Sequence, residues 1–362
     1  MMLNICQLNL NPERRVIILS DIHASLSLFK KLLEKVQYTK YDYLFINGDL
    51  CEKGMHSLEV VRYVKEMKEQ SKDVFVTKGN CDILYRYVFS GNEGILPYMK
   101  KHRQSILNEM LSEQDKSLEE FDDISKLAQF YRENYKEEME WLESLPIAYE
   151  TEHFILVHAG IENRPDWEKT EEAIALSIDS FLDKGHQVKK NIIVGHWPAV
   201  NYRFDMESTN NPYIDREKRI IAIDGGNQIK RDGQLNALIF ENNQYSYVFV
   251  DEIEEEKNVI MDYVDQTKRV GTVTWPNYEM RMIEREAYFT FCENVKLGYK
   301  QWIKNEYLAE RDGSFYCKDD LSTTFLSVKK GEMVKILDAA QSGYTLVKKG
   351  NGLVGWIPSE II

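Results

Sequence analysis

The feature that most constrains the fold is the alternation of short apolar runs with amphipathic segments over the first 80 residues. The runs RVIIL (15–19), YDYLFIN (41–47) and VFVT (74–77) are rich in β-branched and aromatic residues, which favour strands. The segments 25–36 and 57–70 carry apolar residues three and four apart, which is the spacing of an amphipathic helix. This β-α-β-α-β order predicts a sheet with helices packed on its faces.

Each of these strands ends in side chains of the kinds that bind metal ions. In such sheets the loops at the carboxyl ends of the strands form the site. A mixture of carboxylate, imidazole and amide ligands suits a pair of divalent cations, which can clamp a phosphoryl group and activate a water. The predicted ligands, in chain order, are Asp21, His23, Asp49, Asn80, His158 and His196.

A charged stretch interrupts the alternation between about residues 98 and 145. It contains neither glycine nor proline and has helical periodicity, so it is predicted to form two or three amphipathic helices. We call it the helical insert and expect it over or beside the sheet. Strand-like runs then return, from HFILV (153–157) to YSYVFV (245–250). The sequence thus predicts one α/β domain over residues 1–250.

The alternation of strand-like and helical segments ends at the acidic junction DEIEEEK (251–257). Short strand-like runs follow, and QWIKNEYL (301–308) aligns weakly with GWIPSEII (355–362) at a spacing of 54 residues. Two small β-barrels in tandem produce such a pattern. The predicted boundaries are 251–308 for a degenerate barrel and 309–362 for the second one.

Composition limits the partners and the compartment. The formal net charge is −13, which argues against a nucleic-acid footprint, because that needs a basic face. No apolar run is long enough for a membrane span and the N-terminus lacks the pattern of a secretory signal. Five dispersed cysteines suit free thiols in a reducing compartment. We therefore expect a cytoplasmic protein.

The order DxH, GD, GN, VHAG, GH resembles the calcineurin-like metallophosphoesterase superfamily over roughly residues 14–250. The family fold is a β-sandwich flanked by helices. The resemblance implies that Asp21 and His23 hold a first metal and that Asp49 bridges to a second, which the remaining ligands hold. GHWP and the later IDGG (223–226) are similar to GHTP and IDTG of the phosphoprotein phosphatase branch.

Two motifs depart from that branch. Its GDxxDRG is GDLCEKG here, so Glu52 and Lys53 stand where the family has aspartate and a phosphate-binding arginine. Lysine keeps the positive charge but lacks the bidentate fork. Asn80 is followed by Cys81, where the family usually has a histidine acting as general acid. Arg86 is a candidate for a second phosphate-binding cation.

The role of Cys81 stays open. A thiol can donate a proton, but more weakly than imidazolium, so hydrolysis of alkyl phosphates is expected to be slow. The alternative is a small buried side chain without a catalytic role. The sequence GNCD also resembles one branch of small phosphodiesterases in the superfamily.

Residues 314–362 resemble an SH3 domain, through LSVKKGE, VKIL and GWIP. In that family a polyproline-type peptide docks on aromatic residues. Tyr316, Trp356 and Pro358 are candidates for such a groove, unless these residues form the core of the barrel itself.

The resulting hypothesis is a phosphomonoesterase similar to Ser/Thr protein phosphatases. A metal-bound hydroxide would attack phosphorus, with Asp49, Glu52, Lys53, Asn80 and Cys81 as catalytic residues. Two divalent ions are implied, manganese being favoured over iron, zinc or nickel. The partners would be a phosphoprotein or small phosphoester and a ligand of the SH3-like tail. The alternatives are a phosphodiesterase or dinucleoside polyphosphate hydrolase, and a non-catalytic scaffold.

Overall fold

The computed structural model describes residues 3–362, and the chain forms two units. The first comprises the residues up to 197 together with 212–229 and 234–250. The second comprises 198–211, 230–233 and 251–362. The main change of unit lies at residue 250, with two short segments of the preceding sequence also belonging to the second unit. Within the described residues, no helix has the length and apolar character needed to cross a membrane.

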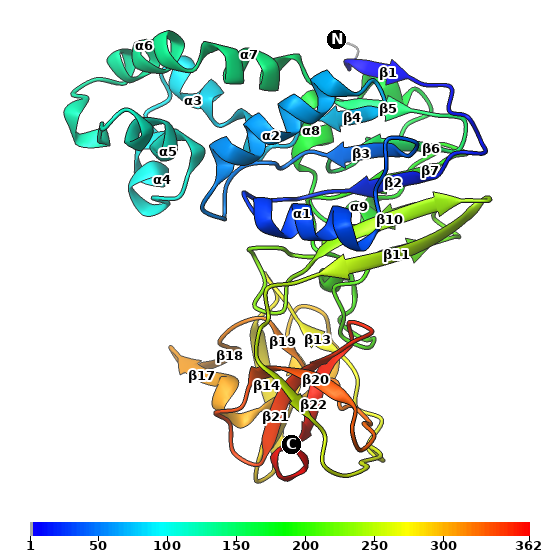
Figure 1. Ribbon diagram of the computed structural model, residues 1–362. Helices are drawn as coiled ribbons and strands as arrows, with labels where there is room; N and C mark the ends of the chain where they lie inside the picture. The colour runs from blue at the N-terminus through cyan, green and yellow to red at the C-terminus, as the bar shows by residue number, and fades with distance from the viewer. Residues whose placement is uncertain (1–2) are drawn as a thin grey trace. The chain divides into compact units, whose positions relative to one another are not determined.

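The first sheet has the order β11-β10-β2-β3-β4 (Figure 1). Strands β2 (Val16–Leu19), β3 (Tyr43–Asn47) and β4 (Val74–Thr77) are parallel. The hairpin β10 (Leu235–Glu241) and β11 (Gln244–Val250) is antiparallel and extends the β2 side. The helices α1 (Leu26–Lys35) and α2 (Ser57–Gln70) connect the parallel strands, as the alternation predicted.

The second sheet has the order β1-β5-β6-β7-β9-β8. Short helices precede or follow its strands. The strands are β1 (Ile5–Gln7), β5 (Ala148–Glu150), β6 (Phe154–Val157), β7 (Asn191–Val194), β8 (Tyr213–Asp215) and β9 (Ile220–Ala222). The helices are η3 (Trp167–Lys169), α8 (Glu172–Ser177), α9 (Phe181–Lys184) and η4 (Ala199–Tyr202).

The two sheets pack face to face as a sandwich. Because side chains alternate along a strand, Ile18 of β2 contributes to the core between the sheets, whereas Ile17 and Leu19 join the core that includes α1 and α2. Phe45 of β3 meets Phe154 of β6 edge to face, with ring centroids 5.6 Å apart. Both faces of the first sheet are therefore covered, which explains why its strands are apolar throughout.

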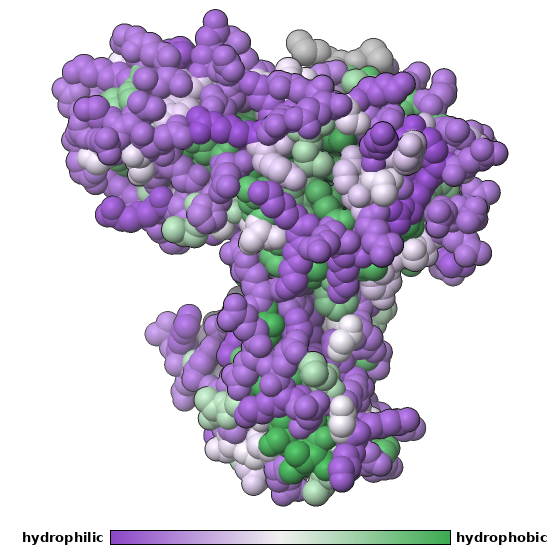
Figure 2. Space-filling model, in the orientation of Figure 1, coloured by the Kyte–Doolittle hydropathy of each residue, from purple (hydrophilic) through white to green (hydrophobic). Residues whose placement is uncertain are grey.

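The helical insert contains four α-helices rather than two or three. They are α4 (Ile95–Lys101), α5 (Ile106–Glu113), α6 (Ile124–Asn134) and α7 (Lys136–Ser144), with η2 (Leu118–Glu120) between α5 and α6. The short helices η1 (Cys81–Ile83) and α3 (Tyr85–Phe89) precede them. Ser105 and Asp123 cap α5 and α6 through side-chain bonds to backbone N–H groups, which divides the segment. The outer face of these helices is mainly hydrophilic (Figure 2).

The second unit is all β. A five-stranded antiparallel sheet has the order β16-β15-β14-β18-β17, a four-stranded one β12-β20-β21-β22, and β13 pairs with β19. The first sheet contains β14 (Glu279–Arg285), β15 (Phe289–Asn294), β16 (Lys300–Lys304), β17 (Leu308–Arg311) and β18 (Ser314–Cys317). The others are β12 (Glu256–Asn258), β13 (Thr272–Val273), β19 (Leu321–Ser322), β20 (Met333–Asp338), β21 (Tyr344–Lys349) and β22 (Val354–Pro358).

The weak sequence repeat has a structural counterpart. In each copy a Trp-Ile strand, β16 or β22, runs directly into a single 3₁₀ turn, η5 (Asn305–Tyr307) or η6 (Ser359–Ile361). Pairing crosses the predicted boundary at 308/309, because β18 pairs with β14 and β12 pairs with β20.

Trp356 lies in the core of the second unit and does not line a groove. Its side chain is 0% exposed, its indole N–H donates to Ser322 O at 2.8 Å, and Phe289 packs edge to face against it. The alternative stated for this residue is therefore correct. A buried indole needs such a hydrogen-bond acceptor, which Ser322 of β19 supplies.

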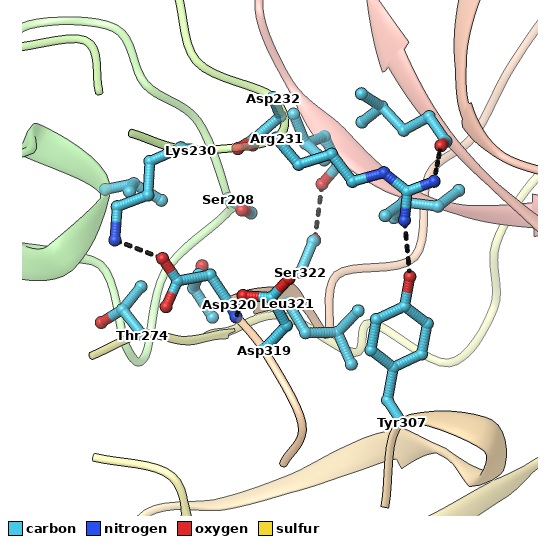
Figure 3. Close-up of a pocket in the computed structure, with 15 residues that line it drawn as sticks. Ser208, Lys230, Arg231, Asp232, Thr274, Tyr307, Asp319, Asp320, Leu321 and Ser322 are labelled. Carbon is cyan, nitrogen blue, oxygen red and sulfur yellow. Dashed lines mark hydrogen bonds and ion pairs between the residues drawn. The ribbon is translucent and has the colours of Figure 1, made fainter. Parts of the chain in front are cut away.

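Residues 230–233 are joined to this unit by charged side chains (Figure 3). Lys230 forms an ion pair with Asp320, and Arg231 donates to the Tyr307 hydroxyl at 2.9 Å. The cavity they line has a volume of about 30 Å³. That is room for about one or two waters rather than for a ligand.

Candidate metal centre

The structure brings all six predicted ligands together. Asp21 and His23 follow β2, Asp49 follows β3, and Asn80 follows β4. His158 follows β6 of the other sheet directly, and His196 comes two residues after β7. Strands β2, β3 and β4 are parallel to one another in the first sheet, and β6 and β7 are parallel to each other in the second. The carboxyl ends of each set therefore meet at one edge of its sheet.

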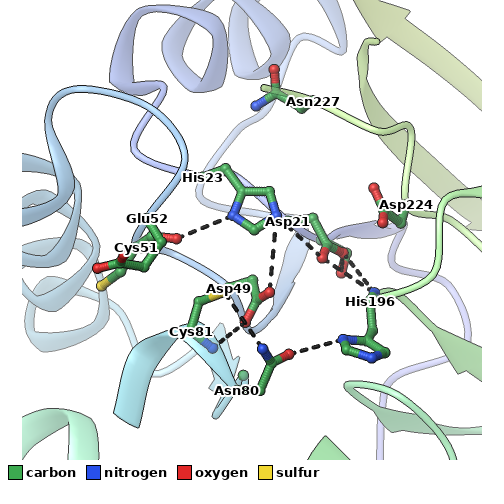
Figure 4. Close-up of polar contacts among 12 residues, drawn as sticks. Asp21, His23, Asp49, Cys51, Glu52, Asn80, Cys81, His196, Asp224 and Asn227 are labelled. Carbon is green, nitrogen blue, oxygen red and sulfur yellow. Dashed lines mark hydrogen bonds and ion pairs between the residues drawn. The ribbon is translucent and has the colours of Figure 1, made fainter. Parts of the chain in front are cut away.

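Asp49 is common to two ligand clusters. One consists of His23, Asp49 and Cys81, and the other of Asp49, His158 and His196; within each, one candidate ligand atom per residue lies within 4.8 Å of the others. Asp49 Oδ1 is 3.3 Å from His158 Nε2, and Oδ2 is 3.9 Å from His23 Nε2. Figure 4 shows Asp49 between His23 and Asn80. Its two oxygens thus face different sets of ligands, as a bridging carboxylate requires.

Asp21 and Asn80 complete the two clusters. Asp21 Oδ1 lies 3.8 Å from His23 Nε2, and its carboxylate accepts the backbone N–H of His196. The side-chain amide of Asn80 lies 3.0 Å from His158 Nε2 and 2.8 Å from His196 Nδ1. The side-chain amide of Asn80 and the two imidazoles therefore converge on one point.

Backbone carbonyls orient two of the imidazoles. His23 Nδ1 lies 3.1 Å from Cys51 O, and His158 Nδ1 lies 2.9 Å from Asn47 O. A proton on each Nδ1 satisfies these contacts and leaves Nε2 with its lone pair directed at Asp49. Such outer hydrogen bonds fix the tautomer of metal-binding histidines.

The backbone is strained at four of the six ligands. Asp21, His23, Asp49 and His196 have φ values of 56°, 47°, 50° and 65°, in the left-handed region that residues other than glycine rarely occupy. Strain of this kind clusters at functional sites, where the surrounding structure holds it. Four such residues in one cluster therefore mark this edge of the sandwich as a functional site.

The glycines of the GN and GH motifs allow the ligands to approach each other. A Cβ on Gly79 would lie 2.3 Å from Asp49 Oδ1, and one on Gly195 would lie 2.2 Å from Asp21 Oδ2. Either contact is far inside van der Waals distance. The glycines are thus required by packing around the carboxylates.

Buried carboxylates dominate the electrostatics of the cluster. Burial, and then the neighbouring charge of Asp224, raise the pKa of Asp21 well above its usual range. Burial alone would raise the pKa of Asp49 too, but His158 and His23 hold it below its usual range. Burial lowers the pKa of His158, and Asp49 more than compensates, raising it to about 10. Charges this deeply buried are costly unless an opposite charge lies between them.

The donor set fits divalent metal ions. Carboxylate and amide oxygens with imidazole nitrogens suit first-row divalent ions, and a cation between Asp21, Asp49 and the neighbouring Asp224 would neutralise their mutual repulsion. Four of the six predicted ligands, His23, Asp49, His158 and His196, fall in the two ligand clusters, and Asp49 is shared. That the six predicted residues hold two ions stays a prediction.

Comparison with known proteins agrees with this geometry. A family model described as calcineurin-like phosphoesterase matches residues 14–226, which is more than half of the 362 residues. The chain belongs to the calcineurin-like phosphoesterase family. Members of this family use a dinuclear metal centre, consistent with the shared position of Asp49.

Curated relatives are named symmetrical bis(5'-nucleosyl)-tetraphosphatase. The one from Haemophilus ducreyi is 28% identical over 176 residues, 46% of this chain and 54% of that protein. The one from Actinobacillus succinogenes is 30% identical over 169 residues, 46% and 50% of the two chains. This phosphoesterase thus spans about half the length of the curated relatives it matches. The solved metallophosphoesterase from Sphaerobacter thermophilus is 17% identical, with a TM-score of 0.38 over 66% of this chain and 88% of that one.

Asp82 supports the metal centre of this phosphoesterase and was not predicted as a site residue. Its carboxylate accepts the backbone N–H groups of Gly79, Asp49, Leu50 and Cys51 at 2.8–3.2 Å. It therefore ties the loop after β3 to the loop after β4. The sequence signal was the acidic residue that follows GNC, and its role depends on contacts 31–33 residues away in the chain.

Asp224, of the IDGG segment, is a second residue that the prediction missed. It is completely buried and accepts the backbone N–H of Gly226 at 2.7 Å. It lies close enough to Asp21 to raise the pKa of that carboxyl, and both appear in Figure 4. The resemblance of IDGG to a phosphatase segment was noted in the sequence, but its proximity to β2 is visible only in the fold.

Cys81 belongs to the ligand cluster that contains His23 and Asp49, although the sequence did not predict it as a metal ligand. Its backbone N–H donates to Asp49 Oδ1 at 2.9 Å, and its side chain is 6% exposed. Burial, and then the Asp49 charge, raise the pKa of the thiol well above its usual range. A raised pKa disfavours the thiolate form, which argues against a nucleophilic thiolate.

The structure does not bring Glu52 into the cluster, contrary to the role predicted for it. Its buried carboxylate accepts hydrogen bonds from the Tyr98 hydroxyl at 2.6 Å and from the Ser105 hydroxyl at 2.9 Å. Both donors belong to the helical insert. Lys53 next to it is exposed, and its charge is among the influences that lower the pKa of His23.

Arg86 is also held away from the cluster. Its guanidinium donates to Glu143 from two nitrogens, at 2.9 and 2.5 Å, and to Glu172 at 2.7 Å. These two carboxylates occupy the guanidinium N–H groups that would bind a phosphate. The geometry therefore favours a structural role over phosphate binding.

Replacement of Arg86 by alanine tests whether this residue has a structural role or binds phosphate. We expect kcat/KM within about twofold of the parent, and a free energy of unfolding lower by about 1 kcal/mol at pH 7, because the pair is partly exposed. Burial would raise the pKa of Glu143, but Arg86 and Tyr85 lower it to about 2. The stability difference should therefore be complete above pH 4.5 and shrink as the pH falls towards 2. Urea unfolding at several pH values measures it; a large rise in KM would instead assign Arg86 to the substrate.

Proposed function

We propose that this phosphoesterase hydrolyses a phosphoanhydride bond of a dinucleoside polyphosphate, rather than phosphomonoesters of proteins. The observation that carries the proposal is the buried Cys81 thiol beside Asp49, at the position where the phosphatase branch has its histidine. The names of the curated relatives support this alternative better than the protein phosphatase hypothesis.

The leaving group explains why Cys81 matters. An alkoxide such as that of serine must receive a proton as it departs, and general acid catalysis contributes about 10²–10⁴-fold. A nucleoside phosphate leaves as a stable anion and needs no such proton at neutral pH. A thiol whose pKa is raised by burial is a weak acid, so the site suits good leaving groups.

The residues of the chain have separate tasks in this proposal. The metal ions, when bound, would supply a nucleophilic water and stabilise charge on the phosphoryl oxygens. Asp49 sets the position of the ions relative to one another, and His23 and His158 keep Nε2 available through their carbonyl contacts. Lys53 is exposed at the rim and would attract the anionic substrate.

A side-by-side assay with Mn²⁺ tests the function. We would measure kcat/KM for diadenosine tetraphosphate, a phosphoserine peptide and bis-p-nitrophenyl phosphate. The proposal expects the tetraphosphate to be preferred over the peptide by at least about 10²-fold, the lower end of the contribution of a missing acid. Preference for the peptide would restore the phosphatase hypothesis, and turnover of the diester alone would indicate a phosphodiesterase.

Replacement of Cys81 by alanine tests the role of the thiol. We expect hydrolysis of diadenosine tetraphosphate to change by less than about threefold, because no general acid is needed. A thiol acting as general acid would instead lose about 10²-fold or more. Cys292→Ala, in the core of the second unit, is the matched control for removing a buried thiol.

A further inference from the structure

The loop that carries Asp49 is fastened to the helical insert by one buried side chain. Glu52 is 1% exposed. Its Oε1 accepts from the Ser105 hydroxyl and the Ile106 N–H, both at 2.9 Å, and its Oε2 accepts from the Tyr98 hydroxyl at 2.6 Å. A carboxylate with three donors holds α4 and the start of α5 at a defined position next to the metal centre.

The side chain of Lys53, the next residue in this loop, is exposed. Glu52 and Lys53 have φ values of 70° and 69°, and these two left-handed residues separate a buried carboxylate from an exposed ammonium. Lys53 directly follows Glu52, which accepts from the Tyr98 hydroxyl at 2.6 Å, and the Tyr98 ring packs against His102. These contacts place Lys53 next to the insert.

The neighbouring surface of the insert is cationic. The His102 ring packs against Tyr98, with ring centroids 4.4 Å apart. Lys101 stands three residues after Tyr98, on the same helix face. Within residues 3–362, neither Lys53 nor Lys101 forms a direct ion pair with a carboxylate, although burial raises the pKa of the adjacent Glu52 and the Lys53 charge partly offsets that rise. We name Lys53, Lys101 and His102 the insert strip.

The side chains of the insert strip suit an anionic ligand. Burial, and then the charges of Lys53 and Lys101, lower the pKa of His102, which reports repulsion among the three. The whole chain carries a net charge of −13, so local positive charge would be needed to attract an anionic substrate. Phosphate oxygens fit lysine ammonium and imidazole donors.

We propose that the insert strip binds the phosphate groups of the substrate that extend beyond the one held at the metal ions. The strip would then make this phosphoesterase selective for chains of several phosphates. This inference rests on the proposed function and adds its specificity determinant, with Glu52 as the positioning residue. A substrate with a single phosphorus would occupy the metal centre without reaching the strip.

Two variants of the strip, Lys101→Glu and His102→Ala, test the inference in the full chain with Mn²⁺. We expect kcat/KM for diadenosine tetraphosphate to fall by about 10-fold or more, through KM, because a charge-assisted hydrogen bond is lost. Turnover of bis-p-nitrophenyl phosphate should stay within about twofold, because that substrate makes no such contact.

Lys100→Glu is the matched control. Lys100 lies on the same helix but lines a separate pocket of about 200 Å³ with Met99 and Arg103. It carries the same charge change, and it should leave both substrates unaffected. Lys100 and Lys101 could instead act only by stabilising the carboxyl end of the α4 helix dipole. In that case Lys100→Glu and Lys101→Glu should have equal effects, and that result would overturn the inference.

The two proposals fail in different ways. If the parent protein does not hydrolyse diadenosine tetraphosphate, the proposed function is wrong. If it does, and the strip variants keep the parent ratio of tetraphosphate to diester kcat/KM, only the insert strip is refuted. Glu52→Gln adds a further readout: the amide keeps only one acceptor oxygen, so the contact with either Tyr98 or Ser105 is weakened. This should lower the same ratio while the metal content stays at the parent value.

Discussion

Replacement of Asp49 by asparagine is expected to lower turnover by about 10³-fold, beyond the 10–100-fold that outer-shell partners of a metal contribute. Asp49 is the residue common to both ligand clusters. An amide keeps the shape but removes the negative charge and the second anionic oxygen. The two metal positions would then lose their shared ligand.

Two measurements check this expectation. The first is kcat/KM on bis-p-nitrophenyl phosphate with saturating Mn²⁺, and the second is metal content by mass spectrometry after gel filtration. Asp73→Asn is the matched control, since Asp73 pairs with Arg14 at 2.8 Å away from the cluster. An Asp49→Asn protein that retained two ions per chain and turnover within tenfold would contradict the bridging role.

Replacement of Asp82 by alanine is expected to lower the free energy of unfolding by about 3–5 kcal/mol, the range for breaking a buried charged network. Four backbone N–H groups lose their acceptor at once, and each unsatisfied buried donor costs about 1–3 kcal/mol. Part of that cost is offset, because burial and the Asp49 charge raise the pKa of Asp82 to about 6. Removing this carboxylate therefore relieves some repulsion.

Urea unfolding of the metal-free and Mn²⁺-bound proteins measures this effect. Asp82→Asn should fall between the parent and Asp82→Ala, because the amide retains one acceptor oxygen. Asp122→Ala, an exposed residue paired only with Lys126 in the helical insert, is the control. Equal stability of Asp82→Ala and Asp122→Ala would show that the four N–H groups find other acceptors.

Local pattern was sufficient for a helix-covered sheet and for the candidate ligands, whereas the sandwich was implied by the family resemblance. The alternation of strands and helices placed polar residues at the carboxyl ends of parallel strands, which meet at one edge of a sheet. This is why the structure brings together Asp21 and Asp49 although they are far apart in the sequence. The repeat of Trp-Ile strands was likewise visible in the sequence, because it is a local pattern.

The direction of a buried side chain was decided only by tertiary packing. Glu52 follows the metal ligand Asp49 by three residues, yet its partners lie 46–54 residues ahead in the helical insert. The sequence allowed Arg86 to bind phosphate, but in the fold its guanidinium donates to Glu143, 57 residues away. The sequence allowed Trp356 to line a peptide groove, but in the fold its side chain is buried.

The sequence alone therefore determined which residues are candidate metal ligands and that they follow strands, because strand period is a local property. The packing of two sheets decided that these strand ends meet. Only the tertiary structure decided what surrounds them: the Asp82 carboxylate under the Asp49 loop, Asp224 beside Asp21, and the insert strip beside Lys53. Those contacts join residues with no shared periodicity, since they depend on how the insert and the loops pack.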